Sequence, residues 1–267
     1  MRAGISLGVV SAVLAIVSLT AAQTQAPTPA PRSETRDRYL NPRETDLSLG
    51  LEVDPKEVPD IPPVEPDKVL DTFRIKKGFR VELVAHEPMV VDPIQMAFDE
   101  DGRLYIVEMR WYQSETRTDL MFDGRIGRMR LLEDFNADGR FDKSTIFADK
   151  LRYPSAVIPY DGGVYVGLEP DLIYLKDRNG DGVADVRQVV FTGFGNQRER
   201  LDSQMFMNSL TWGLDNRIHG AKGHGGTIAA VTASDAMPLD LRNRDFSFDP
   251  RTHTMRPESG GGKQGLT

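Results

Sequence analysis

The hydrophobic and polar residues of this chain follow a short-period pattern from about residue 73 onward. Residues 79–85 (Phe-Arg-Val-Glu-Leu-Val-Ala) alternate apolar and polar side chains with a period close to two. This alternation is typical of a β-strand with one buried face. After the first 22 residues, no segment of convincing length has the spacing of an amphipathic helix. The pattern therefore predicts an all-β fold.

Three segments share one further pattern: an apolar run, a tight-turn pair and a second apolar run. They span residues 93–106, 154–166 and 208–220, and their turn pairs are Asp101-Gly102, Asp161-Gly162 and Asp215-Asn216. Asp-Gly and related pairs supply the positive φ angles that two-residue hairpin turns require. The sequence therefore predicts three β-hairpins that repeat along the chain.

Each predicted hairpin is followed by further strand-like residues, which gives about four strands in every 45–60 residues. This repeat is typical of the blades of a β-propeller. A β-sandwich also consists of short strands and turns and is the alternative. Residues 67–267 provide only three to four blades, and the end at Ser259-Gly-Gly-Gly262 lacks a closing strand. We therefore expect the N-terminal part of a truncated propeller, because an open propeller leaves a bare sheet edge.

The first 66 residues differ from the rest. Arg2, an apolar run over residues 5–19 and the small residues Thr20-Ala21-Ala22 predict a signal peptide over 1–22. An uncleaved anchor is the alternative, although the apolar run is short for a membrane span. Residues 23–66 are rich in proline and charge and are predicted to form a linker. We therefore expect an exported protein, located in the periplasm or associated with the cell envelope.

The net charge and the amino-acid composition exclude several kinds of binding site. The net charge of −7 argues against a nucleic-acid-binding surface. The absence of cysteine excludes disulfides, thiolate metal sites and a covalent haem motif within this chain.

Two nine-residue stretches, at 134–142 and 177–185, share the pattern D-x-N-x-D-G-x-x-D and begin 43 residues apart. Positions 1, 3, 5 and 9 offer oxygen ligands for a hard cation, and glycine at position 6 permits a sharp turn. We therefore predict two Ca²⁺ sites. The predicted ligands are Asp134, Asn136, Asp138 and Asp142 in the first loop and Asp177, Asn179, Asp181 and Asp185 in the second.

The two stretches are incomplete as EF-hands, because position 12 is Thr145 in one and Gln188 in the other instead of glutamate. Their flanking residues are branched or aromatic and favour strands over helices. We therefore expect calcium-stapled β-hairpin loops. A metal-free turn rich in Asp, Asn and Gly is the alternative.

Several runs carry a resemblance to a known family. They include Gly78-Phe-Arg-Val-Glu-Leu83, Asp92-Pro-Ile-Gln-Met-Ala-Phe98, Trp212-Gly-Leu-Asp-Asn216 and Ser259-Gly-Gly-Gly262. Residues 69–267 resemble the planctomycete-type membrane-bound dehydrogenase family, related to quinoprotein glucose and sorbosone dehydrogenases. The resemblance implies a sugar or alcohol dehydrogenase with Ca²⁺, a PQQ-like quinone and a cytochrome c domain or partner as electron acceptor.

The residues expected to transfer protons depart from that family pattern. The position that carries the base in the related sugar dehydrogenases is Met205, which cannot accept a proton. His219 and His224 are the remaining candidates, because one lies at a predicted hairpin end and the other in the glycine-rich run 220–226. We expect the fragment to be inactive by itself. A non-catalytic, calcium-stabilised propeller that binds carbohydrate or protein is the alternative function.

Overall fold

A computed structural model describes residues 62–110, 127–195, 206–223, 226–230, 237–262 and 265. The predicted signal peptide and most of the predicted linker lie outside these residues. Residues 64–267 form one compact unit, which is almost entirely β. The described part contains one short 3₁₀ helix, η1 (Val69–Thr72), and no helix in it is long and apolar enough to cross a membrane.

The first sheet is a four-stranded antiparallel meander in the order β1-β2-β3-β4. Its strands are β1 (Pro93–Phe98), β2 (Leu104–Glu108), β3 (Gly127–Glu133) and β4 (Lys143–Leu151). The predicted Asp101-Gly102 turn joins β1 to β2, with Gly102 at φ 77°. The first predicted hairpin is therefore confirmed.

The second sheet contains six strands in the order β12-β11-β8-β7-β6-β5. They are β5 (Ala156–Tyr160), β6 (Gly163–Gly167), β7 (Asp171–Lys176), β8 (Val186–Thr192), β11 (Thr227–Ala230) and β12 (Leu239–Asp240). The expectation of four strands in every unit is wrong for this sheet. Strands β11 and β12 follow β10 in the chain but join the edge of β8, where Ala229 pairs with Thr192.

The third sheet has four strands in the order β14-β13-β10-β9. They are β9 (Asn208–Trp212), β10 (Ile218–Ala221), β13 (Phe246–Asp249) and β14 (Thr254–Pro257). Strands β11 and β12 lie between β10 and β13 in the chain. The segment that forms the third sheet therefore also contributes two strands to the second sheet. The Asp161-Gly162 and Asp215-Asn216 turns form as predicted, with Asp161, Gly162 and Asn216 at positive φ.

One predicted strand is absent. Residues 79–85 carry no regular secondary structure, because a strand requires a hydrogen-bonded neighbour and these residues have almost none among the described residues. The backbone link that this segment makes to the sheets is a hydrogen bond from Phe141 N to Val84 O, at 3.4 Å. The prediction of a half-buried strand is therefore wrong here, because the described residues include no strand that pairs with this segment.

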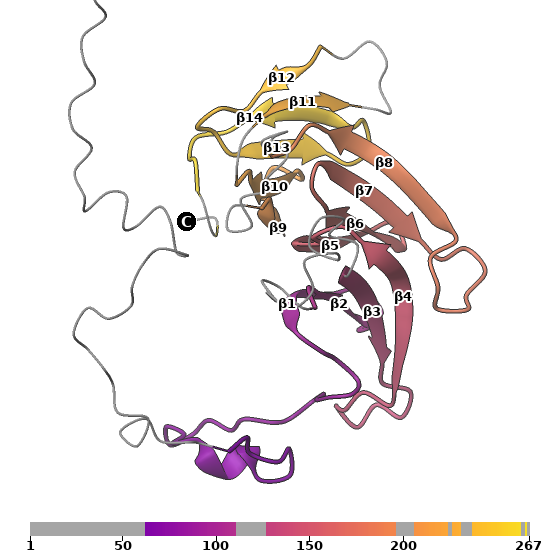
Figure 1. Cartoon of the computed structure of the whole chain (residues 1–267). Helices are drawn as coiled ribbons and strands as arrows, with labels where there is room; N and C mark the ends of the chain where they lie inside the picture. The colour runs from indigo at the N-terminus through magenta and orange to yellow at the C-terminus, as the bar shows by residue number, and fades with distance from the viewer. Residues whose placement is uncertain are drawn as a thin grey trace, which may run out of the picture. The chain divides into compact units, whose positions relative to one another are not determined.

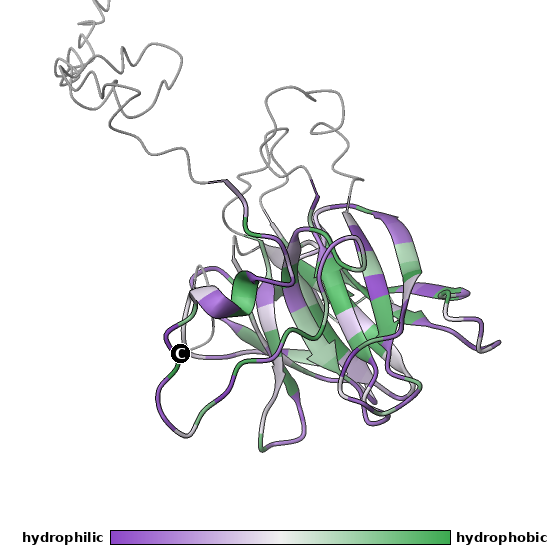
Figure 2. Cartoon of the chain, turned by 90° about the horizontal axis from the view of Figure 1, so that it is seen from below, coloured by the Kyte–Doolittle hydropathy of each residue, from purple (hydrophilic) through white to green (hydrophobic). Residues whose placement is uncertain are grey.

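Hydrophobic residues are concentrated in the strands (Figure 2), and the core lies between the sheets. One buried cluster joins the first two sheets through residues such as Phe147 and Val166. A second joins the second and third sheets, where Phe248 packs edge-on against Tyr165 with ring centroids 5.1 Å apart. Each sheet buries apolar side chains against its neighbour, which holds the three sheets in chain order.

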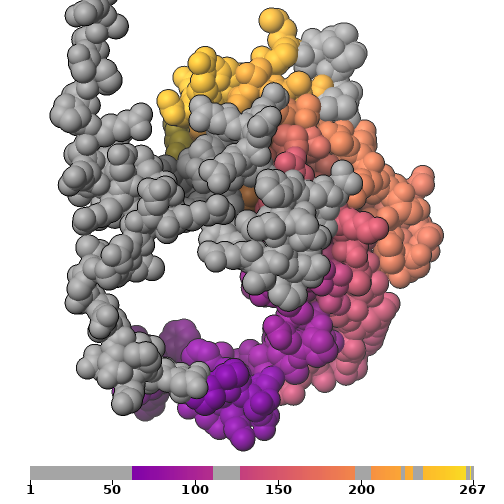
Figure 3. Space-filling model, in the orientation of Figure 1, coloured from indigo at the N-terminus to yellow at the C-terminus, as the bar shows by residue number. Residues whose placement is uncertain are grey.

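The three sheets follow one another around a curve, with β1, β5 and β9 on the inner side and β4 and β8 on the outer side (Figure 1). The space-filling view shows the same succession as contiguous bands of atoms (Figure 3). Because the strands are antiparallel, the β1–β2, β3–β4, β5–β6, β7–β8 and β9–β10 connections lie at one end of their sheets, the hairpin end. The fold is therefore all-β and propeller-like.

Candidate functional site

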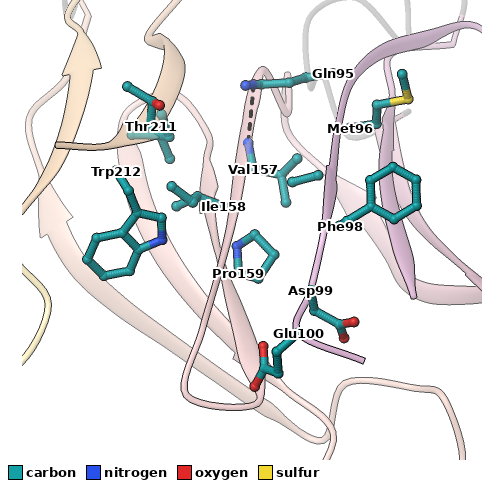
Figure 4. Close-up of a pocket in the computed structure, with 12 residues that line it drawn as sticks. Gln95, Met96, Phe98, Asp99, Glu100, Val157, Ile158, Pro159, Thr211 and Trp212 are labelled. Carbon is teal, nitrogen blue, oxygen red and sulfur yellow. Dashed lines mark hydrogen bonds between the residues drawn. The ribbon is translucent and has the colours of Figure 1, made fainter. Parts of the chain in front are cut away.

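A cavity of about 410 Å³ lies where the first strands of the three sheets meet (Figure 4). Residues of β1, β5 and β9 line it, together with Asp99 and Glu100 from the β1–β2 turn. The lining runs from Gln95 and Val157, near the starts of β1 and β5, to Trp212 at the end of β9 and to the β1–β2 turn. The cavity therefore reaches the hairpin end of the sheets.

The side walls of the cavity are apolar. Trp212 forms one wall, with 46% of the residue exposed, and its ring is tilted against Tyr160 with centroids 6.0 Å apart. Met96 and Phe98 line the cavity from β1 and are 63% and 61% exposed, and the Phe98 ring stacks on Phe141 with centroids 6.5 Å apart. An exposed aromatic ring such as that of Trp212 suits a flat, partly apolar ligand such as a sugar ring.

Polar groups are distributed between these walls. Gln95 lies at the β1 side, where its Oε1 accepts a hydrogen bond from Val157 N at 3.2 Å, which orients the side-chain amide. Thr211 supplies a hydroxyl from β9, and Glu100 supplies an exposed carboxylate at the turn. The neighbouring Asp99 is held by Arg103 Nε at 2.8 Å. The cavity thus combines apolar walls with a few fixed hydrogen-bonding groups.

The two aspartate-rich loops are folded alike and connect β3 to β4 and β7 to β8. In both, the glycine at position 6 donates its N–H to the first aspartate: Gly139 to Asp134 at 2.9 Å and Gly182 to Asp177 at 2.7 Å. In both, the aspartate at position 5 donates its N–H to the asparagine at position 3. The expected hairpin loops are confirmed, and helices do not flank them.

The charge state of the second loop suits a cation. Burial raises the pKa of Asp177, but the backbone N–H groups of Gly182, Gly180, Asn179 and Asp181 lower it below the usual aspartate value. These donors keep the carboxylate ionised. In the first loop, Asp134 Oδ1 is buried and has no hydrogen-bond donor. A buried carboxylate oxygen without a donor fits a hard cation as its missing partner.

The described residues contain no group of three or more His, Cys, Asp or Glu side chains gathered as a metal site. Most loop carboxylate oxygens instead accept backbone N–H groups, and asparagine supplies one predicted ligand in each loop. Calcium binding therefore stays a prediction from the loop pattern, the ionised Asp177 and the Asp134 oxygen.

Position 8 of each loop connects it to the preceding part of the chain. Phe141 N donates to Val84 O at 3.4 Å, and Ala184 N donates to Phe147 O in β4 at 2.8 Å. Phe141 also borders a smaller cavity of about 270 Å³, which His86 and Leu70 line from the N-terminal side. Each loop thus contacts the unit before its own.

Of the candidate proton-transfer residues, the structure describes His219, which does not line the cavity. His224 and Met205 lie outside the described residues. His219 lies on β10 opposite Thr211, one strand behind the cavity wall, and its Nε2 is 3.0 Å from Asp215 Oδ1. The hydrogen bond with His219 holds the pKa of Asp215 below its usual value. Arg256 Nη2 also contacts Asp215, at 2.7 Å, so His219 belongs to a polar surface network.

A set of buried charged residues lies at the other end of the sheets, and sequence reasoning missed all of them except Glu108. Four such side chains are largely inaccessible among the described residues: Glu108, Glu169, Lys222 and Asp245. Asp245 accepts the backbone N–H groups of Lys222, Gly261 and Gly262 at 3.0–3.3 Å, which fixes the Ser259-Gly-Gly-Gly262 run. Burial lowers the pKa of Lys222. The residue types are ordinary, so only their burial distinguishes them.

Residues 65–267 match the family described as a domain of unknown function (DUF7133), and the chain belongs to that family. No curated protein matches the chain.

Two solved structures show distant likeness. A luciferin-regenerating enzyme is 11% identical, with a TM-score of 0.34 over 63% of this chain and 45% of that chain. PorZ, a surface component of the type-IX secretion system of Porphyromonas gingivalis, is 16% identical, with a TM-score of 0.34 over 67% of this chain and 21% of that chain. This chain therefore spans less than half the length of either protein.

Proposed function

We propose that the chain is the calcium-binding part of an exported β-propeller whose sheets act as blades and whose central cavity binds a carbohydrate or a related polyol. The observation that carries this proposal is the cavity between β1, β5 and β9. Its lining combines the exposed Trp212 ring with polar groups at Gln95 and Glu100. Sugar rings stack on aromatic faces through C–H groups while their hydroxyls take hydrogen bonds from such side chains.

Calcium has a structural role in this proposal. The four oxygen-bearing residues of each loop would hold one ion, and Asp134 Oδ1 would gain the partner it lacks. A bound ion supplies positive charge that neutralises the loop carboxylates. Because Ala184 of the second loop contacts β4, an ion there would fix the edge between the first two sheets. Those two sheets also form two walls of the cavity.

The resemblance to quinoprotein dehydrogenases supports a more specific version of this function. In it, the bound sugar or alcohol is a substrate, a PQQ-like quinone accepts the hydride, and a cytochrome c domain or partner takes the electrons. Of the two histidines predicted to transfer protons, His219 is the one that the structure describes. Its separation from the cavity by β9 favours the non-catalytic binding module for this chain taken alone.

Ligand binding can be tested by the fluorescence of Trp212. The chain contains two tryptophans, so Trp111→Phe leaves Trp212 as the only reporter. Titration with a panel of mono- and disaccharides should give a saturable change in its emission with at least one sugar. No response to any sugar, either with calcium or in a chelator, would exclude the cavity as a carbohydrate site.

A redox assay distinguishes the dehydrogenase from the non-catalytic binding module. The full chain, incubated with calcium and PQQ, is assayed for sugar-dependent reduction of an artificial electron acceptor. We expect binding without turnover. Sugar-dependent dye reduction at rates typical of enzymes would instead establish the dehydrogenase and overturn the expectation of an inactive fragment.

A further inference from the structure

Residues 79–85 have the sequence of a strand but lie beside no strand in the described part of the chain. Arg80 Nη2 and Glu82 Oε1 are 3.1 Å apart, and their side chains are 83% and 62% exposed. Side chains two residues apart lie on the same face of an extended backbone, whereas on a helix they point in different directions. The segment is therefore a preformed extended chain with an exposed ion pair on one face.

One edge of this segment bonds to the first aspartate loop, and on the other edge only Phe79 N is bonded among the described residues. Backbone groups of alternate residues point to opposite edges of an extended chain. Val84 O accepts from Phe141 N, so the even-numbered residues direct their groups toward the first aspartate loop. The odd-numbered residues face the opposite edge. Among the described residues, the hydrogen bond on that edge runs from Phe79 N to Lys76 O, at 3.1 Å.

The same segment exposes apolar side chains. Phe79 is 72% exposed, and Val81 is 46% exposed. An open strand edge that carries exposed apolar residues is a site for pairing with another strand.

The sequence of the segment complements itself. In antiparallel pairing with an identical strand about a two-fold axis at Val81, Arg80 of each copy faces Glu82 of the other. Phe79 then faces Leu83. Opposite charges and apolar pairs directly across two strands stabilise their pairing. This register uses Phe79 O, the N–H and C=O groups of Val81 and the N–H of Leu83. It leaves the bond between Phe141 N and Val84 O and the bond between Phe79 N and Lys76 O intact.

We propose that a second copy of this chain pairs with residues 79–83 in this register, forming an isologous dimer with two ion pairs between Arg80 and Glu82. The two-fold axis makes both contacts identical, as in most homodimers. A short strand pair buries less than a standard interface of about 1,600 Å². We therefore expect a weak dimer that dissociates in the micromolar range.

Charge reversal tests the register. The full chain is examined by sedimentation equilibrium, alongside Arg80→Glu, Glu82→Arg and the double variant that carries both. Each single change places like charges opposite each other and should weaken dimerisation about 10-fold or more, while the double variant restores it. Arg242→Glu is the matched control, since Arg242 and Asp240 form a similar exposed pair at 2.6 Å. A wild-type chain that stays monomeric to high concentration, or a double variant no better than the singles, overturns the proposal.

A cysteine scan provides a second test that does not depend on charge. The chain has no cysteine, so Val81→Cys introduces a single thiol. At the two-fold axis its Cα atoms would lie about 5.5 Å apart, within reach of a disulfide. Leu83→Cys thiols would lie about 13 Å apart in this register. Oxidation should cross-link the first variant and leave the second monomeric. Equal cross-linking of both, or of neither, rules out the proposed register.

Discussion

Ala184 N donates a hydrogen bond to Phe147 O at 2.8 Å and so connects the second aspartate loop to the outer strand of the first sheet. Phe141, the equivalent residue of the first loop, makes the corresponding bond to Val84. The two loops therefore share a tertiary role as well as a sequence pattern. Through this hydrogen bond, each loop connects its own strand pair to the preceding part of the chain.

The first prediction concerns the two loops. Asp138→Ala combined with Asp181→Ala removes a predicted ligand from each, so saturable calcium uptake in isothermal titration should be lost. The calcium-dependent rise in melting temperature should disappear with it, because a ligand stabilises only the state that binds it. Asp101→Ala, in an exposed hairpin turn, is the control and should bind calcium like the wild type. Unchanged uptake in the double variant would show that the loops are metal-free turns.

The second prediction concerns acid stability. The folded-state pKa of Asp177 is lowered, so this carboxylate stabilises the fold at pH values above its unfolded pKa of about 3.9. That contribution is lost as the pH falls through the folded-state pKa. Asp177→Asn should therefore lower the melting temperature at pH 7 in a chelator, and the difference from wild type should shrink toward pH 2. A difference that stays constant with pH would assign the effect to altered packing instead.

The third prediction concerns the strands that the third unit adds to the second sheet. Gly193 has φ 105°, and a Cβ there would lie 2.2 Å from Thr227 O. Gly193→Ala should therefore destabilise the fold by about 2 kcal/mol or more in urea unfolding, because both the backbone conformation and the close contact resist it. Gly102→Ala separates the two causes, since Gly102 has φ 77° with nothing within 4 Å. Its expected loss is about 1 kcal/mol. Equal losses would mean that the contact with Thr227 contributes nothing.

The fourth prediction concerns the core between the second and third sheets. Phe248 is fully buried and contacts Tyr165 and Phe191 with ring centroids 5.1 and 5.4 Å apart. Phe248→Ala should lower the free energy of unfolding by about 3–5 kcal/mol. Phe98→Ala, at an exposed position on β1, should cost less than about 1 kcal/mol. A small effect at Phe248 would contradict the packing of these sheets against each other.

The fifth prediction concerns the cavity. Trp212→Ala removes one aromatic wall and should weaken binding of any sugar identified by fluorescence about 10-fold or more, measured for this variant by isothermal titration. Leu214→Ala is the control, because Leu214 lies in the same hairpin but is fully exposed and does not line the cavity. Similar affinities in both variants would place the sugar elsewhere.

Local sequence patterns determined much of this fold. The turn pairs at Asp101-Gly102, Asp161-Gly162 and Asp215-Asn216 formed hairpins, because the φ angles of a tight turn depend on the residues in the turn itself. Both aspartate loops formed between strands for the same reason. Their side chains bond to backbone groups only a few residues away, so sequence spacing fixes their geometry.

Longer-range features depended on contacts that no local pattern encodes. The alternation in residues 79–85 predicted a strand. A strand also needs a neighbouring strand to form hydrogen bonds with, and the sequence of the segment itself cannot provide one. The pairing of β11 with β8 joins segments from different units, and the pattern within β11 does not specify which edge it joins. The cavity likewise exists only because β1, β5 and β9 meet, and burial of Glu108 and Lys222 follows from the packing around them. The sequence by itself thus determined the hairpins, their turns and the two aspartate loops. Tertiary packing decided which strand edges and sheet faces meet, because those contacts join residues far apart in the chain.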